Sequence, residues 1–167
     1  MNLDIDIEDW PDCEYPAGEW ETLAGKIAEA AIAVAPELGN SRLCASLLFT
    51  SDEHVHELNR EWRDKDKPTN VLSFPMLKRA QLLVLSTDGP PEMLGDLALA
   101  YETCAREADE KSLSLHDHAA HLILHGLLHL AGYDHETAQE DADKMEALEI
   151  EALAKLGIAD PYGDHDL

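Results

Sequence analysis

The sequence has few aromatic residues, few cysteines and no long apolar run, and each shortage excludes a class of protein. None of its apolar runs approaches the roughly 18–20 residues of a membrane-spanning helix, so a transmembrane protein is excluded. Aromatic residues make up only 5% of the chain, so aliphatic side chains must fill most of the core. The three cysteines form no CxxC pair, which argues against both a disulfide framework and a thiolate zinc site.

The N-terminal segment lacks the features of a secretory signal. Its first residues, MNLDIDIEDW, carry acids where a signal peptide has a basic region followed by an apolar stretch. A length of 167 residues is typical of one domain, and an apolar content of 45% is enough for a core. We therefore expect a single domain over 1–167 that works in a reducing cytoplasm.

Basic residues are the scarcest charged class. The chain has 12 Lys and Arg against 35 Asp and Glu, which gives a formal charge of −23. On average, such a chain is repelled by nucleic acids and by anionic membranes. Neither a membrane nor DNA is an expected partner.

The few bases are nevertheless concentrated in one segment. Residues 60–79 hold six bases and three acids, a balance of +3, whereas the other 147 residues hold six bases and thirty-two acids, a balance of −26. Beside a metal, these bases would form a cationic cleft that attracts an anionic substrate. Arg63 is the best candidate for binding a phosphate in two-pronged fashion, because a guanidinium matches two phosphate oxygens at once. The alternative is a solvated charge run; the candidate substrate-binding residues are Arg60, Arg63, Lys65 and Lys67.

Apolar periodicity predicts an α+β fold. Strands are expected near 3–7, 43–49, 71–74 and 97–101. Helices are expected near 20–34, 52–62, 114–131 and 138–156. These elements indicate a small mixed β-sheet of about four strands packed with helices.

Three segments carry more specific expectations. The helix near 52–62 should point Val55, Leu58 and Trp62 inward. Residues 76–94 fit either a hairpin or a flexible insertion, because a strand-like run at 81–86 precedes a turn rich in proline and glycine. The tail at 160–167 is expected to be frayed.

Four of the nine histidines lie within the fifteen residues 121–135. On a helix, His125 and His129 are four residues apart and share a face. A turn at Gly132 would let His135 meet them, so that three imidazoles hold one Zn²⁺ and the fourth position stays open to water, as in catalytic sites. Zinc lowers the pKa of such a water to about 7. The alternative is that these are ordinary helix histidines, but the spacing favours a metal-binding helix and turn.

Two further residues are candidates for catalysis. His121 lies one turn before His125, so it could bind the metal, support a ligand or transfer a proton. Asp96, at the start of an expected strand, could bind substrate or orient a neighbour; it could equally be a plain turn carboxylate.

The histidine spacing also resembles the metzincin protease pattern H-E-x-x-H-x-x-G-x-x-H. In that pattern a glutamate serves as the general base, and here its position is occupied by Gly126. A zinc protease is therefore a weak alternative.

Together these motifs resemble the bacterial endoribonuclease YbeY family of rRNA maturation factors. The matching stretches cover most of residues 50–150: the run from Leu58 to Pro75 that contains W-R-D-K-D-K-P-T-N-V-L-S-F-P, then G-D-L-A-L at 95–99, and the histidine motif over 118–135. The family is α+β with a small sheet. Residues 76–94 and the N-terminal extension look longer than the family pattern.

The resemblance implies a function and a site. It implies a metal-dependent endoribonuclease specific for single strands, acting in 16S rRNA 3′-end maturation and ribosome quality control. It also implies zinc at His125, His129 and His135 and a key role for Arg63. Ribosomal proteins, commonly basic, could dock on the acidic body and deliver the rRNA precursor. A noncatalytic zinc-binding ribosome assembly factor remains the alternative.

Overall fold

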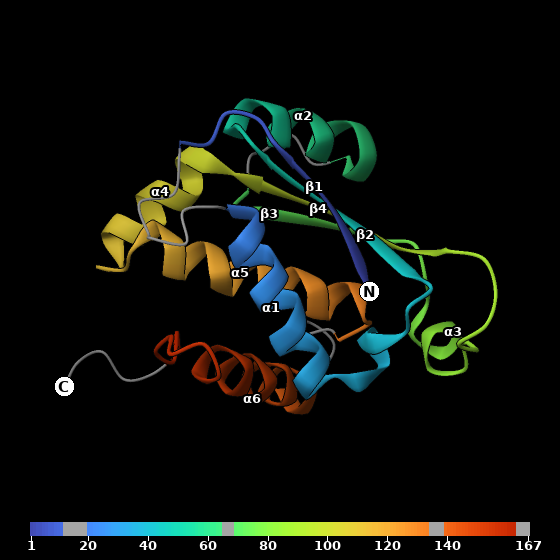
Figure 1. The fold of residues 1–167 in the computed structure, drawn as a ribbon. Helices are drawn as coiled ribbons and strands as arrows, with labels where there is room; N and C mark the ends of the chain where they lie inside the picture. The colour runs from blue at the N-terminus through green and yellow to red at the C-terminus, as the bar shows by residue number, and fades with distance from the viewer. Residues whose placement is uncertain (12–19, 65–68, 134–138, 163–167) are drawn as a thin grey trace.

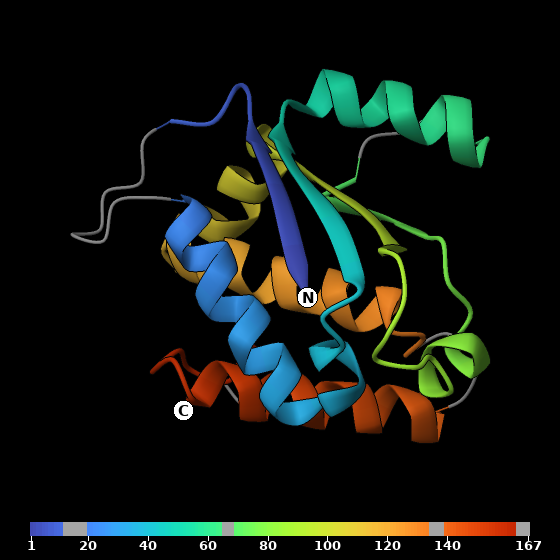
Figure 2. The same ribbon diagram turned by 45° about the vertical axis from the view of Figure 1, so that its right-hand side comes forward.

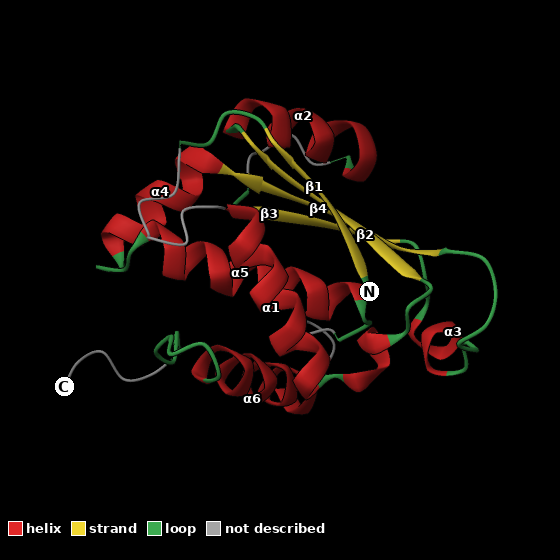
Figure 3. Ribbon diagram, viewed as in Figure 1, coloured by secondary structure: helices red, strands yellow, loops and turns green. Residues whose placement is uncertain are grey.

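The computed structural model describes residues 1–11, 20–64, 69–133 and 139–162. Its centre is a four-stranded sheet, and helices pack on both faces of it (Figure 3). The strands are β1 (Asn2–Ile7), β2 (Leu43–Thr50), β3 (Val71–Pro75) and β4 (Glu92–Ala100). Their order is β1-β2-β4-β3. β1, β2 and β4 run parallel, whereas β3 pairs antiparallel with β4 and forms one edge. The predicted α+β fold with a small mixed sheet is confirmed.

The two faces of the sheet are covered unequally (Figures 1 and 2). One face carries α1 (Trp20–Val34) and α5 (Leu115–Leu130), and α6 (Gln139–Ala154) packs against these two helices on the side away from the sheet; this side holds the main core. Of the described helices, α2 (Asp52–Arg63) covers the other face, over a small cluster around Val55. The remaining elements are a 3₁₀ turn at Pro36–Gly39, α3 (Arg79–Leu83) and α4 (Tyr101–Glu110).

α5 packs closely against β4 because the helix has a glycine at the point of contact. A Cβ atom at Gly126 would lie 2.7 Å from Cδ2 of Leu97, so the helix approaches the strand only because residue 126 has no side chain. At the start of α5 the Ser114 hydroxyl accepts a hydrogen bond from the backbone N–H of Asp117, at 3.0 Å. The helix is thus fixed both at its N-terminus and along the sheet.

Two predictions about elements are wrong. The strand-like run at 81–86 begins in α3, where the Gln81 side chain accepts a hydrogen bond from the Lys78 N–H and only Leu82 is buried. Tyr101, expected to end a strand, instead starts α4. Residues 76–94 comprise α3, a loop and the start of β4, and whether they are an insertion stays a prediction.

The expected inward position of Trp62 is also wrong. Its side chain is 72% exposed, because it lies in the last turn of α2, beyond the small cluster that buries Val55.

The structure describes the chain after α6 as far as residue 162. Residues 161–162 form a turn in which the Tyr162 N–H donates to the Asp160 carboxylate at 2.7 Å. The expected fraying of the tail stays a prediction, and 163–167 lie outside the described residues. Among the described helices, none is long and apolar enough to cross a membrane.

Candidate active site

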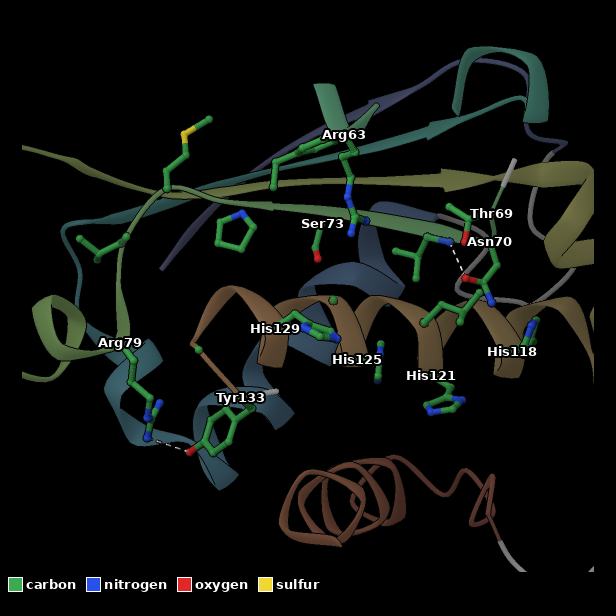
Figure 4. A pocket seen from close by; sticks show the side chains of 18 of the residues that line it. Arg63, Thr69, Asn70, Ser73, Arg79, His118, His121, His125, His129 and Tyr133 are labelled. Carbon is green, nitrogen blue, oxygen red and sulfur yellow. Dashed lines mark hydrogen bonds between the residues drawn. The ribbon is translucent and has the colours of Figure 1, made fainter. Parts of the chain in front are cut away.

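A cleft of about 1130 Å³ lies between the edge strand β3 and α5. Figure 4 shows Arg63 and Ser73 pointing into it from the strand side, with the histidines of α5 opposite. Among the described residues that line it, the cationic side chains are Arg63, Lys78, Arg79 and Lys111, and none is Asp or Glu. The cleft is thus a cationic site on an acidic protein.

The α5 wall carries three of the histidines singled out in the sequence. His121, His125 and His129 recur every four residues and line the cleft. The ring centroids of His125 and His129 are 4.7 Å apart, and those of His121 and His125 are 6.3 Å apart. His135 lies outside the described residues, so the three-histidine metal site stays a prediction.

The turn after α5 has the form expected from Gly132. Gly132 has a φ of +95°, and its N–H donates to the His129 carbonyl at 2.9 Å. The Tyr133 N–H donates to the Leu128 carbonyl at 3.0 Å, so the chain turns sharply out of the helix.

Arg79 holds this turn in place. Its guanidinium donates to the Ala131 carbonyl at 2.7 Å, lies 4.3 Å from the Tyr133 ring centroid and pairs with the Glu37 carboxylate at 3.0 Å. The Tyr133 hydroxyl also donates to Glu37, at 2.9 Å. Burial alone would raise the pKa of Glu37, but these hydrogen bonds and the charge of Arg79 lower it.

Glu149, on α6, is a site residue that was not predicted from the sequence. It is fully buried, and His125 Nδ1 lies 2.5 Å from its Oε1. The Tyr162 hydroxyl donates to its Oε2 at 2.5 Å, and His121 Nε2 lies 3.4 Å from the same oxygen. Burial would raise the pKa of Glu149, but the hydrogen bonds from His121, His125 and Tyr162 lower it to about 2, so it is a carboxylate.

These contacts fit a metal at the predicted position. A ligating imidazole usually donates its second ring N–H to a carboxylate or carbonyl, and His125 has a carboxylate in that place. The described residues contain no complete group of three ligands, since the predicted third one is His135. His125 and His129 could hold the ion from the α5 wall.

His121 points toward α6 rather than toward Arg63 (Figure 4). Its Nε2 lies 3.1 Å from the Tyr162 hydroxyl, and its ring meets the Tyr162 ring edge-on. The structure therefore brings His121 together with Glu149 and Tyr162, and its predicted role in proton transfer stays a prediction.

Of the two predicted substrate-binding residues that the structure describes, Arg60 and Arg63, the opposite wall brings in Arg63. Arg63, the last residue of α2, lines the cleft and is exposed. Arg60 is exposed but does not line the cleft. Lys65 and Lys67 lie outside the described residues.

Asp96 is not brought together with the histidines. Side chains alternate along β4, so Leu97 faces α5 while Asp96 faces α2. Asp96 accepts a hydrogen bond from the Ser46 hydroxyl in a separate cavity of about 390 Å³, which Trp62 also lines. Its predicted catalytic role therefore finds no support in the placement of the side chain.

A second histidine–carboxylate pair, in which only the histidine is buried, lies at the far end of the cleft. His118 is only 1% exposed, and its Nε2 lies 2.9 Å from the Glu107 carboxylate, which also accepts from Asn70 at 3.0 Å. Burial lowers the pKa of His118, against the effect of Glu107.

Several cleft residues carried weak sequence signals. Glu149 interrupts the apolar stripe of α6 between Met145 and Ala152. An acidic residue in an otherwise apolar, buried stripe was the one sequence signal that could have identified it. Ser73, Lys111 and Tyr162 offered none, because only the fold brings them to the cleft.

Known proteins resemble this chain over almost all of its length. A family model described as Endoribonuclease YbeY matches residues 6–157. A relative named Endoribonuclease YbeY from Erythrobacter litoralis is 66% identical over 164 residues, covering 98% of this chain and 99% of the relative. One of the same name from Novosphingobium aromaticivorans is 54% identical over 166 residues, covering 98% and 97%.

One solved structure is similar in fold. The solution structure of TM1509 from Thermotoga maritima aligns with a TM-score of 0.57 over 97% of this chain and 99% of that chain. The sequence identity is 22%, so this likeness bears on the fold alone.

Proposed function

This chain belongs to the YbeY family of endoribonucleases and is a hydrolase that acts on RNA, and we propose that its substrate is single-stranded and that cleavage requires one zinc ion. The family predicted from the sequence motifs is thereby confirmed. His125, His129 and His135 are the proposed ligands.

The cationic cleft is the observation that carries this proposal. The chain as a whole has a charge of −23, yet the described lining of the cleft contains four Lys or Arg side chains and no acid. A cleft of one sign focuses an oppositely charged ligand, and here that ligand is a polyanion. Bases on an unpaired strand are free to enter such a cleft, whereas those of a duplex are stacked and paired.

The two walls divide the chemistry. A bound zinc ion would supply Lewis acidity and an activated water. Arg63 faces the α5 wall across the cleft and neutralises charge that develops on the non-bridging phosphate oxygens. Ser73, beside Arg63, offers a hydroxyl to the same phosphate.

Within the cell, we place this activity in the cytoplasm, in 16S rRNA 3′-end maturation and ribosome quality control. Outside residues 60–79 the chain has a charge of −26, which suits basic ribosomal proteins as partners that deliver the rRNA precursor.

The test compares three substrates with and without metal. Purified protein is incubated with a labelled single-stranded RNA, with the same RNA annealed to its complement, and with an unstructured peptide. The proposal predicts cleavage of the single strand only, lost with EDTA and restored by zinc. Cleavage that persists in EDTA contradicts the zinc requirement, equal cleavage of the duplex contradicts the strand preference, and RNA binding without cleavage favours the noncatalytic assembly factor.

A further inference from the structure

A fully buried carboxylate lies directly behind the histidines of α5. Glu149 has no exposed surface, and its neighbours on the same stripe of α6 are the buried Met145, Ala152 and Leu153. Burying a charge in such surroundings is costly unless hydrogen bonds compensate for the lost water. An apolar residue would fill this position at lower cost, so the carboxylate calls for a functional explanation.

The hydrogen bonds of Glu149 indicate that its function concerns His125. Oε2 of Glu149 accepts from the Tyr162 hydroxyl, and a carboxyl group that accepts at both oxygens makes the 2.5 Å contact of Oε1 with a His125 ring that carries its proton on Nδ1. A neutral imidazole protonated on Nδ1 has its lone pair on Nε2. The contact with Glu149 therefore selects which ring nitrogen of His125 is able to bind a metal.

The second oxygen of the carboxylate is held from another part of the chain. The Tyr162 hydroxyl donates to Oε2 at 2.5 Å and lies 3.1 Å from His121 Nε2. Tyr162 lines the cleft although it follows α6 in the sequence. Glu149 thus cannot rotate away from His125 without breaking contacts with Tyr162 and His121.

We propose that Glu149 is a positioning residue that holds His125 in the form protonated on Nδ1, and that Tyr162 locks Glu149 in this orientation. The inference rests on the proposed function, because it takes His125 to be a metal ligand. It adds two residues, from α6 and from the segment after it, to the machinery of the cleft.

A purely structural role makes a different prediction. If Glu149 only ties α6 to α5, its replacement changes stability, and zinc affinity changes only as far as the folded fraction does. If it positions His125, zinc affinity falls even in a variant that is as stable as the wild type. Replacing a buried charge by an apolar residue of similar volume is often neutral or stabilising, so Glu149→Met separates the two roles.

The experiment uses the full chain without RNA. The ring ¹⁵N shifts of His125 are measured by NMR in the metal-free protein, and zinc affinity is measured by competition with a chromophoric chelator. Thermal unfolding of each metal-free variant reports its stability. Because no step involves RNA, failure of this inference is distinguishable from failure of the nuclease proposal.

The variants are graded in what they remove. Glu149→Met removes the hydrogen-bond acceptor and is expected to weaken zinc binding about 10–100-fold. It should also lower the population of His125 that is protonated on Nδ1. Glu149→Gln keeps an acceptor but no charge and should fall between Met and the wild type, while Tyr162→Phe should lose less than Glu149→Met. Glu151→Gln removes an exposed acid from the same helix and should match the wild type in both measurements.

Two results would overturn the proposal. One is a wild-type His125 protonated on Nε2 in the metal-free protein. The other is zinc affinity within twofold of the wild type in folded Glu149→Met. Should that variant not fold, the wild-type spectrum and Tyr162→Phe, which changes a partly exposed residue, decide the question.

Discussion

The two walls of the cleft are built in opposite ways. On the α5 wall, the histidines project from a helix packed against β4, and His125 is hydrogen-bonded to the buried Glu149. On the other wall, Arg63 ends α2 on the thinly covered face of the sheet and is exposed. One wall is tightly packed and the other is solvated.

This difference matches the demands of the two tasks. Metal ligation tolerates errors of only a few tenths of an ångström, so it needs side chains locked by packing and by hydrogen bonds behind them. A charge that meets a phosphate acts over a longer range and with looser geometry. Substitutions in the α5 wall should therefore lower metal content and stability. Substitutions in the Arg63 wall should lower the rate of RNA cleavage alone.

The largest effect is expected on the α5 wall. His129→Ala should lose both bound zinc and RNA cleavage, and zinc should no longer raise its melting temperature, because a ligand that binds the folded state stabilises it. Elemental analysis and thermal unfolding check this. His116→Ala, on the same helix but outside the cleft lining, is the matched control, and a full zinc complement in His129→Ala would sink the ligand assignment.

On the opposite wall, a charge reversal should spare the metal. Arg63→Glu is expected to lower the rate of RNA cleavage by about 10²–10³-fold or more, since it replaces a stabilising charge with a repelling one. Zinc content and melting temperature should stay as in the wild type. Arg106→Glu, at an exposed position of α4, is the control; normal cleavage by Arg63→Glu would remove Arg63 from the site.

The packing of the α5 wall predicts a stability effect. Gly126→Ala should destabilise the fold by about 1–3 kcal/mol, because its Cβ would displace the buried Leu97 side chain. Gly25→Ala in α1 meets no atom within 4 Å and should instead stabilise by about 0.5–1 kcal/mol. Urea unfolding measures both, and equal effects of the two variants would show that α5 does not need its close approach to β4.

The turn that leaves the α5 wall should respond to acid. The folded state lowers the pKa of Glu37 below its ordinary value of 4.5, so its contribution to stability is complete above that pH and is lost as the pH falls through the lowered pKa. Glu37→Gln should cost about 1–3 kcal/mol at pH 7 and progressively less at lower pH. Urea unfolding at a series of pH values tests this; a cost that does not shrink in acid would contradict it.

The smallest effect is expected at Trp62, which precedes Arg63 in the last turn of α2. Trp62→Ser should change the free energy of unfolding by about 0.5 kcal/mol or less, since the indole is 72% exposed. A loss of several kcal/mol in urea unfolding would show that this tryptophan is buried in solution.

The sequence predicted the fold well where periodicity was strong. The helix over Trp20–Val34 and the strand beginning at Leu43 have the expected bounds, because each buries one regular face. α4 was missed, since the alternation of Leu97, Leu99 and Tyr101 continues the strand pattern into the helix.

The site was predicted only where its residues are neighbours in sequence. The spacing of His121, His125 and His129 sufficed to place them on one helix face. Asp96 was proposed from its place at the start of an expected strand, and the pleat of β4 turns it to the face of the sheet away from the histidines. Glu149 reaches His125 through the packing of α6 on α5, which no local pattern encodes.

The order of these residues along the chain also bears on how the protein is made. Arg63 and the histidines of α5 leave the ribosome before Glu149 and Tyr162, the two groups that fix the His125 ring. A nascent chain that has emerged only as far as α5 therefore holds the basic segment and the imidazoles without their support. Under the proposed function, we therefore expect competence to bind the ion to be acquired late in translation, once α6 and Tyr162 have emerged.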